Sequence, residues 1–384
     1  MSPFCSRLMK PILIYKELPV RNSKLFVWVF MPHRVTEQGL ISQLGDETPL
    51  YRQELADVFA ELSLKWKWQP ITLENMHAVV EEVAASGNEY IPVVLNYCIG
   101  DEDTNYPGTC VYKLLEAKGI ASTGADFDSM ELSTSKIRMK RAFVEAGVPT
   151  APYEVIVDPS RVQGICDRLG TPLIVKPAMS FESRGLSVQS VVHSDEQLSE
   201  QVQRLLCGQH GMQFPPDSIF VERFINGSEF TVFLIGSVHQ PESIKIYPPV
   251  ERVFHSSLPE TERFLSYERY HGKCEEETPL SPEATLFHCQ RVNPTLHDRL
   301  CDLAKRAYCA VGGNGFGRVD VRMDKASQQL FVLEVNPNCD ITGDRRSSVG
   351  KILHLSGTSF AQLMSEIIAA ALARTKTSCL SLKG

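Results

Sequence analysis

The sequence predicts an α/β protein that begins with a doubly covered parallel sheet and continues into mixed α+β domains. Over the first 120 residues, short apolar runs alternate with segments of helical periodicity. Strands are expected at 12–15, 25–32 and 92–97, and helices at 51–62, 76–85 and 109–117. Strands that alternate with helices of this length form parallel sheets covered on both faces. Around residues 316–338 apolar and polar residues alternate with period two, which indicates a β-hairpin.

Composition narrows the class of protein. A chain of 384 residues with 43% hydrophobic and 22% charged residues is typical of two or three globular domains. The net charge of −7, without a long basic run, argues against a nucleic-acid partner. Apolar runs fall short of the roughly 20 residues of a membrane span, and no signal peptide is recognisable. The 11 cysteines lack metal-ligand spacing, so we expect reduced thiols and a cytoplasmic protein.

Beyond residue 124 the pattern becomes mixed. A helix over 133–147 starts at a Ser/Thr cap and ends at a glycine, and two prolines follow it closely. We therefore divide the chain into domains 1–132, 133–222 and 223–384. Further strands are expected at 153–157, 172–177, 186–192, 218–225 and 229–236, and further helices at 161–169, 195–206, 294–311, 349–355 and 360–374.

The hairpin at 316–338 carries the most informative side chains. Residues two apart on a strand point to the same face, so Arg318 shares a face with Asp320, and Glu334 shares one with Asn336. If the intervening residues Val319, Val321, Leu333 and Val335 pack inward, all four polar side chains lie together. Oxygen ligands beside a guanidinium suit Mg²⁺ that bridges nucleotide phosphates. Taken alone, the pattern also fits a hairpin with one solvated face.

Two lysines are candidates for binding phosphate. Lys176 ends an apolar strand and precedes a loop, which places a compact cation at a dry strand end. Lys136 lies early on the preceding helix. Either lysine, considered by itself, is also compatible with an ordinary surface charge.

A second informative segment is 220–232, in which two apolar strands flank the turn at 226–228. The backbone between Glu222 and Ile225 offers the donor and acceptor that an adenine edge needs, and Glu229 could accept hydrogen bonds from ribose hydroxyls. Ordinary hairpins have the same pattern. The polar loop at 96–109 is equally open to two interpretations, a substrate loop or a solvated loop.

Together, Lys136, Val175-Lys176-Pro177, Glu222 to Ile225 with Glu229, Arg318-Val-Asp320 and Glu334-Val-Asn336 resemble the ATP-grasp superfamily in order and spacing. Within that superfamily the sequence is similar to the D-alanine–D-alanine ligase group over about residues 92–375. The resemblance implies an N-terminal Rossmann-like domain, a small central subdomain and a C-terminal subdomain.

The resemblance also implies roles and a reaction. Arg318 and Lys176 would be catalytic, and Asp320, Glu334 and Asn336 would hold two Mg²⁺, for which Mn²⁺ could substitute. ATP would be bound by Lys136, Lys176, Ser183, Glu222, Arg223, Phe224, Ile225 and Glu229. Such enzymes convert an acid into an acyl phosphate, which an amine then attacks to form a C–N bond. The expected partners are a small acid and an amino acid, and the expected assembly is a homodimer.

The sequence departs from the family's pattern in three places, of which the first bears on how the loop closes over ATP and the other two argue against D-alanine as the substrate. The phosphate-covering loop at 179–185 contains one glycine, where the family's loop is glycine-rich. The Gly-Ser-Glu signature of the D-alanine enzymes is missing after residue 12. After Asn336 the chain continues Pro-Asn-Cys-Asp-Ile-Thr-Gly, without the Pro-Gly-Met-Thr continuation of those enzymes.

A narrower resemblance, carried by residues 66–72, 247–254 and 257–265, is to the mycosporine-glycine ligase subgroup, which joins glycine to 4-deoxygadusol. There the activated group is an enolised diketone, a vinylogous acid. Two alternatives stay open: a small-molecule kinase on the same scaffold, and a nucleotide-binding protein without catalysis. Arg318 favours a ligase, because a kinase forms no oxyanion for it to stabilise.

Overall fold

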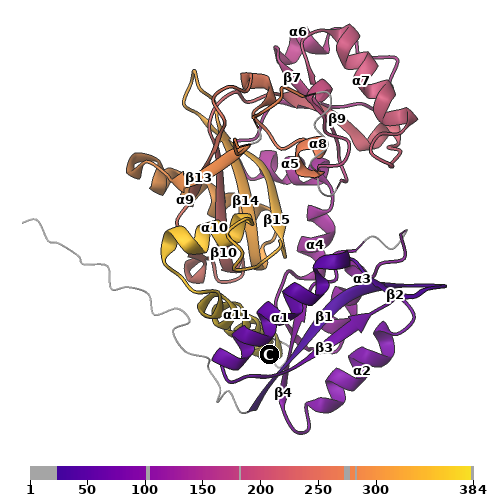
Figure 1. Cartoon of the computed structure of the whole chain (residues 1–384), viewed down its shortest axis with the longest axis vertical. Coiled ribbons are helices and arrows are strands. Elements are labelled where there is room, and N and C mark those ends of the chain that lie inside the picture. The colour runs from indigo at the N-terminus through magenta and orange to yellow at the C-terminus, as the bar shows by residue number, and fades with distance from the viewer. Residues whose placement is uncertain (1–23, 101–103, 181–182, 272–276, 282, 382–384) are drawn as a thin grey trace, which may run out of the picture. The chain divides into compact units, whose positions relative to one another are not determined.

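The computed structural model describes residues 24–100, 104–180, 183–271, 277–281 and 283–381, so the strand predicted at 12–15 lies outside the described residues. The chain divides into two compact units (Figure 1). The first unit combines the described residues of the ranges 1–124, 235–245 and 360–384, and the second comprises those of 125–234 and 246–359. The domain boundaries at 132 and 222 remain predictions.

The first unit is built on a sheet of four parallel strands in the order β3-β1-β4-β5, and β2 pairs antiparallel with the end of β1. The strands are β1 (Leu25–Thr36), β2 (Gly39–Ser42), β3 (Lys65–Ile71), β4 (Ile91–Asn96) and β5 (Ala121–Ser122). The parallel sheet that the sequence predicts is confirmed. β3 was not predicted, because its lysines and glutamine break up the apolar run.

Helices cover both faces of this sheet. They are α1 (Thr48–Glu61), α2 (Met76–Ser86), α3 (Thr109–Ala117) and α11 (Phe360–Ser381). Trp28 and Phe30 point to one face of β1 and pack with valines of α2 and α3. Contacts of α1 with α11, and of α11 with β4 and β5, place these two helices on the other face. Successive side chains of β1 therefore point alternately into the layer of α2 and α3 and into the layer of α1 and α11.

The second unit contains two sheets. The smaller has the antiparallel order β6-β9-β7-β8, formed by β6 (Tyr153–Val155), β7 (Leu173–Pro177), β8 (Val191–Val192) and β9 (Ile219–Arg223). Helices α6 (Ile165–Leu169) and α7 (Asp195–Cys207) pack on it (Figure 1). Val175 and Val221 are fully buried against Leu198 and Val202 of α7. This leaves Lys176 and Glu222, their neighbours along the strands, to point to the opposite face.

The larger sheet has the order β13-β12-β10-β14-β15, and β11 pairs with β10; the end of β10 and the first residue of β11 fall in the range 235–245 that is assigned to the first unit. Its strands are β10 (Glu229–Ser237), β11 (Lys245–Ile246), β12 (Val250–Phe254), β13 (Phe287–Arg291), β14 (Asn314–Met323) and β15 (Leu330–Pro337). The helices of this unit outside α6 and α7 are α4 (Phe127–Ser133), α5 (Lys136–Glu145), α8 (Tyr267–His271), α9 (Pro294–Ala310) and α10 (Ser348–Ser356). β14 and β15 form the predicted hairpin.

Three predicted elements differ from the structure. The strand expected at 186–192 is interrupted by a 3₁₀ turn at Val188–Ser190, because Ser187 and Ser190 cap each other's backbone, and only Val191–Val192 form a strand, β8. The helix expected from 133 begins at Lys136, since Ser135 is extended and its hydroxyl accepts from the Arg138 N–H. The helix expected at 161–169 is shortened to α6 by the left-handed Gly164.

The turn at 226–228 joins the two sheets of the second unit, since β9 and β10 belong to different sheets. Gly227 is required there, because a Cβ at this position would lie 2.0 Å from the Met323 carbonyl oxygen. The Met323 N–H donates to the Ser228 carbonyl and the Lys325 N–H donates to that of Asn226. The turn is thus fixed to the end of β14, and Glu229, just beyond it, starts β10 beside that strand.

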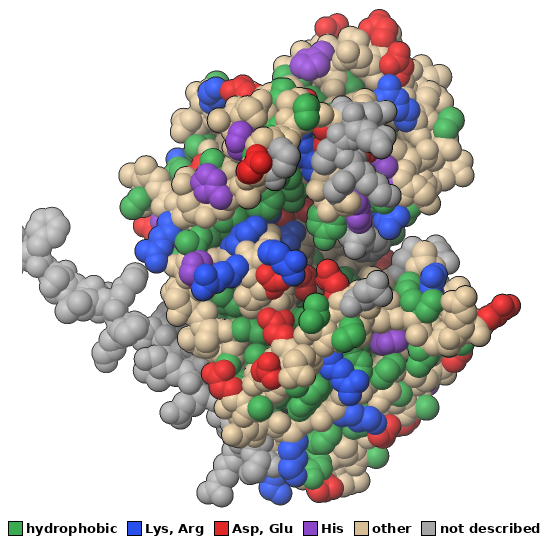
Figure 2. All heavy atoms as spheres, viewed as in Figure 1, with side chains coloured by type: hydrophobic (Ala, Val, Ile, Leu, Met, Phe, Trp, Pro, Cys, Tyr) green, Lys and Arg blue, Asp and Glu red, His purple; other side chains and the backbone are tan. Residues whose placement is uncertain are grey.

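No single described helix is both long and apolar enough to cross a membrane, and one bent pair, α10 with α11, meets that test by length and composition. On the face shown in Figure 2, basic and acidic side chains (blue and red) are interspersed among hydrophobic ones (green). This mixture agrees with the modest net charge of −7.

Candidate active site

A cavity of about 580 Å³ in the second unit is lined by residues of both its sheets. Every site residue expected from the sequence lines this cavity: Lys136, Lys176, Ser183, Glu222, Arg223, Phe224, Ile225, Glu229, Arg318, Asp320, Glu334 and Asn336. The structure thus brings together side chains that are up to 200 positions apart in the chain. The role of each residue remains a prediction.

The β14–β15 hairpin supplies the acidic wall. Arg318 lies opposite Asn336, and Asp320 lies opposite Glu334. Val319, Val321 and Val335 are fully buried on the other face, as the alternation predicts. The register then shifts at a bulge after Asp320. Leu333, expected among the inward residues, is the extra residue of this bulge and lines the cavity.

Hydrogen bonds hold the hairpin face together. The Arg318 Nε and Nη2 donate to one Asp320 oxygen at 3.1 and 3.0 Å. The Thr231 hydroxyl, from β10, donates to the other Asp320 oxygen at 2.9 Å. The Asn336 amide nitrogen is 3.2 Å from Asp320 and 3.3 Å from Glu334. The two carboxylates are therefore linked through Asn336, and their orientation is fixed before any ligand binds.

Two cations compensate the carboxylates. The Lys136 ammonium lies 3.3 Å from Glu334. Burial alone would raise the pKa of the Glu334 carboxyl, but Lys136 and Arg318 outweigh it and lower this pKa to about 2. Burial would lower the pKa of Arg318, and Asp320 with Glu334 raises it, so the guanidinium stays charged. On the hairpin face, positive and negative side chains therefore alternate, and each charge has a neighbour of opposite sign.

The donor set fits a hard divalent cation. Asp320 and Glu334 offer carboxylate oxygens, and the Asn336 amide, turned over, offers a third oxygen. Among the described residues no group of three or more His, Cys, Asp or Glu side chains is close enough to hold a metal ion. A metal at this face would need oxygen atoms from a ligand as well. Cys339 offers no thiolate, since burial raises its pKa to about 12.

The opposite wall is basic and apolar. Glu222 is buried, with its carboxylate paired to Lys140 and, at 2.7 Å, to Lys176. Burial would raise the pKa of Glu222, but the two lysines outweigh it and lower this pKa. Lys140 was missed by the sequence reasoning, although its position four residues after Lys136 places both on one side of α5.

The backbone after Glu222 presents a free donor. The Arg223 and Phe224 N–H groups donate to the carbonyls of Pro152 and Pro172, both at 2.9 Å. Ile225 lines the cavity, and within the described parts of the chain its N–H has no hydrogen-bond partner. A buried N–H is nearly always paired, so this one is a candidate for a ligand contact.

Glu229 lies between two arginines that the sequence reasoning missed. One of its oxygens pairs with Arg252 on the neighbouring strand β12, and the other accepts from Arg322 at 3.1 Å. Arg322 also donates to the Ile225 carbonyl at 3.0 Å. The period-two series Arg318, Asp320, Arg322 was a signal that could have identified Arg322. A ribose hydroxyl would have to share the Glu229 carboxylate with these arginines.

The loop after β7 is described except for residues 181 and 182. Ser180 and Ser183 line the cavity, and Ser183 has a positive φ of 59°. Gly185 also has a positive φ, 79°, and its N–H donates to His210 Nδ1 at 2.9 Å. His210 Nε2 in turn lies 2.7 Å from Glu268 of α8. Side-chain contacts thus hold the end of a loop that has one glycine.

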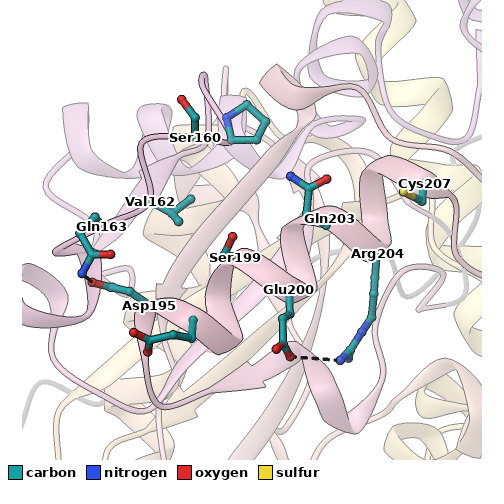
Figure 3. Close-up of a pocket in the computed structure, with 11 residues that line it drawn as sticks. Ser160, Val162, Gln163, Asp195, Ser199, Glu200, Gln203, Arg204 and Cys207 are labelled. Carbon is teal, nitrogen blue, oxygen red and sulfur yellow. Dashed lines mark hydrogen bonds and ion pairs between the residues drawn. The ribbon is translucent and has the colours of Figure 1, made fainter.

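A second hollow of about 770 Å³ lies along one face of α7 (Figure 3). The Glu200 and Arg204 side chains pair with each other there, 3.7 Å apart. Asp195 accepts hydrogen bonds from the Gln163 side chain and from the backbone at the start of α6. These charges are already compensated within the protein, so the hollow offers less for chemistry than the cavity between the sheets.

The fold is the ATP-grasp fold. Its structure is similar to the D-alanine–D-alanine ligase from Bacillus anthracis complexed with ATP, with a TM-score of 0.60 and 18% sequence identity over 92% of this chain and 99% of that chain. The corresponding enzyme from Coxiella burnetii gives a TM-score of 0.61 and 16% identity, over 94% and 97% of the two chains.

The sequence comparisons identify the family. The model for the D-ala D-ala ligase C-terminus matches residues 143–369, more than half of the chain. The D-alanine–D-alanine ligase of Bordetella pertussis is 27% identical over 77% of this chain and 82% of its own length. The chain therefore belongs to the D-alanine–D-alanine ligase family, and it is an ATP-dependent ligase that forms C–N bonds.

We predict that Glu334 makes stability pH-dependent in the metal-free protein. Its pKa of about 2 lies below the ordinary value of 4.5. The charged carboxylate therefore contributes stability that is fully present above about pH 5 and is lost as the pH falls toward 2. The free energy of unfolding of the parent should exceed that of Glu334→Gln by about 2 kcal/mol more at pH 4.5 than at pH 3.

Urea unfolding of both proteins in EDTA, at pH 6, 4.5 and 3, measures this difference. Glu251→Gln is the matched control, because Glu251 lies on the same sheet with an exposed partner, Gln290. A difference between parent and Glu334→Gln that stays constant over this pH range would contradict the account.

Proposed function

We propose that this protein binds ATP and a divalent cation in the cavity of the second unit, phosphorylates a small acid and transfers its acyl group to an amino acid amine. The observation that carries the proposal is the hairpin face, on which Arg318, Asp320, Glu334 and Asn336 meet in one cavity with Lys136 and Lys176. Carboxylates for a metal, lysines for phosphates and an arginine for an oxyanion are the groups that this reaction requires.

The adenine is proposed to lie against the backbone after Glu222. The Ile225 N–H, which has no hydrogen-bond partner among the described residues, supports this placement, because it can donate to a ring nitrogen. The Glu222 carboxylate, whose pKa is lowered, can accept from the adenine amino group. Glu229 would accept from the ribose while it keeps its pairs with Arg252 and Arg322. The phosphates would then extend past Lys176 toward Lys136 and the hairpin face.

Asp320, Glu334 and Asn336 would hold one or two Mg²⁺ or Mn²⁺ ions. When bound, these ions neutralise the phosphate oxygens during phosphoryl transfer. Lys136, which neutralises Glu334 in the structure, would then turn toward phosphate, and Arg318 would keep its hydrogen bonds to Asp320. In the metal-free site the two cations compensate the carboxylates, and in the loaded site the bound metal would do so. The carboxylates are therefore compensated in both states.

The proposed chemistry has two steps. An oxygen of the acid attacks the γ-phosphorus, the bond to the β-phosphate oxygen breaks, and ADP leaves. The amine then attacks the activated carbon, and the carbonyl electrons move onto its oxygen beside Arg318. When the C–O bond breaks, phosphate leaves with that former acid oxygen, and the amine loses a proton. Arg318 is held by two hydrogen bonds to Asp320, which fixes its guanidinium for the oxyanion.

We further propose a vinylogous acid as the substrate, with 4-deoxygadusol and glycine as the specific pair. The proposal rests on the segments at 66–72, 247–254 and 257–265, and on the absence of the D-alanine signatures. An enolised diketone has the acidity and the oxygen nucleophile of a carboxylic acid, so its enol oxygen attacks the γ-phosphorus in the same way. The amine then adds to the carbon that carries the phosphate, the electrons move through the conjugated double bond onto the remaining ketone oxygen, and they return as phosphate leaves and the amine loses a proton, which gives an enaminone. The described cysteines are free thiols, which supports a reducing compartment such as the cytoplasm.

We predict amine-dependent turnover of ATP. The protein with Mg-ATP should release ADP and phosphate in equal amounts when 4-deoxygadusol and glycine are both present, and mass spectrometry should detect their condensation product. D-alanine alone should give no dipeptide. ADP formed with a stable phosphorylated acid would instead identify a kinase. Absence of turnover with a panel of acids and amines would identify a nucleotide-binding protein.

We predict that Arg318 acts on the second step. Arg318→Ala should bind Mg-ATP within a few-fold of the parent and lose product formation by about 10²–10³, because an oxyanion donor in a dry site is worth roughly 3–4 kcal/mol. Arg318→Lys should not restore the rate, because an ammonium lacks the planar fork. ATP affinity and single-turnover product formation are the measurements.

Arg168→Ala is the control, since Arg168 pairs only with Glu154 on the outer surface of the same unit. An equal loss of ATP affinity and of product formation in Arg318→Ala would mean that Arg318 only holds the hairpin face together.

A further inference from the structure

Lys140 is a buried cation that the proposed reaction does not use. It lies on α5, four residues after Lys136, and is only 1% exposed. Taking an ammonium out of water is costly, so a buried lysine persists where all its donors are paired. Lys140 pairs with Glu222, donates to the Thr150 hydroxyl at 2.8 Å and donates to the Ala151 carbonyl at 3.3 Å. Its ammonium thus has one ion pair and two hydrogen bonds.

Glu222 links Lys140 to a second lysine, Lys176, which lines the cavity. Glu222 is 2% exposed and gives one oxygen to Lys140 and the other, at 2.7 Å, to Lys176. Lys176 lines the cavity, whereas Lys140 is not among the residues that line it. The order is therefore Lys140, Glu222, Lys176 and then the ligand. Lys140, which does not line the cavity, therefore pairs with the Glu222 carboxylate, which does.

Lys140 is also linked, through Thr150, to β15, the strand that carries Glu334 and Asn336. The Thr150 hydroxyl, which accepts from Lys140, donates to the Val332 carbonyl at 3.0 Å, and the Val332 N–H donates to Pro149 at 2.8 Å. Val332 lies on β15, two residues before Glu334. Tyr153 and Phe220 rings lie 5.1 and 5.9 Å from the ammonium and exclude water from it. Lys140 thus has a fixed position relative to both β9 and β15.

We propose that Lys140 is a positioning residue that fixes the Glu222 carboxylate in the orientation that accepts the 6-amino group of adenine, and so sets the preference for ATP over 6-oxopurine nucleotides. The inference rests on the proposed placement of the nucleotide. A carboxylate clamped between two cations stays ionised and accepts hydrogen bonds only, so it attracts an amino group and repels a carbonyl oxygen.

The simpler alternative is a structural ion pair. In that case removal of Lys140 would lower the free energy of unfolding and weaken all nucleotides equally. A positioning role instead changes the ratio of two affinities. The ratio of the dissociation constants of Mg-ATP and Mg-ITP separates the alternatives, because ITP differs from ATP at the 6-position and carries the same ribose and phosphates.

Isothermal titration calorimetry on the full chain tests the proposal. Lys140→Met keeps the length of the side chain and removes its charge. We expect it to weaken ATP binding about tenfold or more and ITP binding by less than threefold, so that the preference for ATP falls. Lys325→Met, the same substitution at an exposed lysine that pairs with Glu260, should keep the ratio within about twofold of the parent. An unchanged ratio in Lys140→Met would overturn the proposal.

If Lys140→Met does not fold, the neutral pair Lys140→Met with Glu222→Gln replaces it and is compared with Glu222→Gln alone. Both variants should show the same reduced preference for ATP, because Lys140 acts only through Glu222. A further loss of ATP affinity in the double variant would contradict this. Failure of the parent to bind either nucleotide would overturn the proposed function itself, an outcome distinct from binding both with an unaltered ratio.

Discussion

The site depends on the neutralisation of two carboxylates that the hairpin register brings face to face. Asp320 and Glu334 occupy opposing positions on β14 and β15, where like charges repel. Arg318 on the same strand and Lys136 from α5 each pair with one of them. Because the repulsion is compensated from both sides, the acidic face forms in the absence of metal. The position of α5 against the hairpin follows from the same requirement.

Two further buried glutamates in the cavity each lie between two cations. Glu222 lies between Lys140 and Lys176, and Glu229 lies between Arg252 and Arg322. Buried ion pairs add little net stability, since desolvation offsets their attraction. Apolar residues of similar volume would hold two sheets together at least as well. These buried charges fit the ligands proposed for the cavity, a polyphosphate and an acid.

Much of this arrangement could be predicted from the sequence, because local alternation decides which strand residues share a face. Arg318, Asp320, Glu334 and Asn336 were grouped by period two, and the structure places them on one face. The bulge that moves Leu333 into the cavity could not be predicted, because it depends on how Asp320 pairs across the hairpin. Lys140 looked like one more charge on an amphipathic helix. Its burial follows from the packing of α5 against β9, a contact between residues about 80 positions apart.

The sequence also predicts part of the fold: the strands β1 and β4 could be recognised, whereas β3 and the role of the turn at Gly227 could not. Apolar runs such as β1 and β4 are buried on both faces, and their pattern does not depend on distant partners. β3 alternates tryptophan with lysine, and the tryptophans find aromatic and cationic neighbours that only the fold supplies, such as Phe59 beside Trp66. The turn at Gly227 has the sequence of a hairpin turn. It connects two sheets because the end of β14 takes its backbone hydrogen bonds.

The central claim is that the hairpin face directs an acid oxygen onto phosphorus and releases it again when the amine attacks. Oxygen-isotope transfer tests this most directly. With the reacting acid oxygen labelled with ¹⁸O and a single turnover in unlabelled water, the account predicts one ¹⁸O atom in each phosphate released together with the condensation product. Unlabelled phosphate would show that water, and not the acid, had attacked ATP, and would contradict the account.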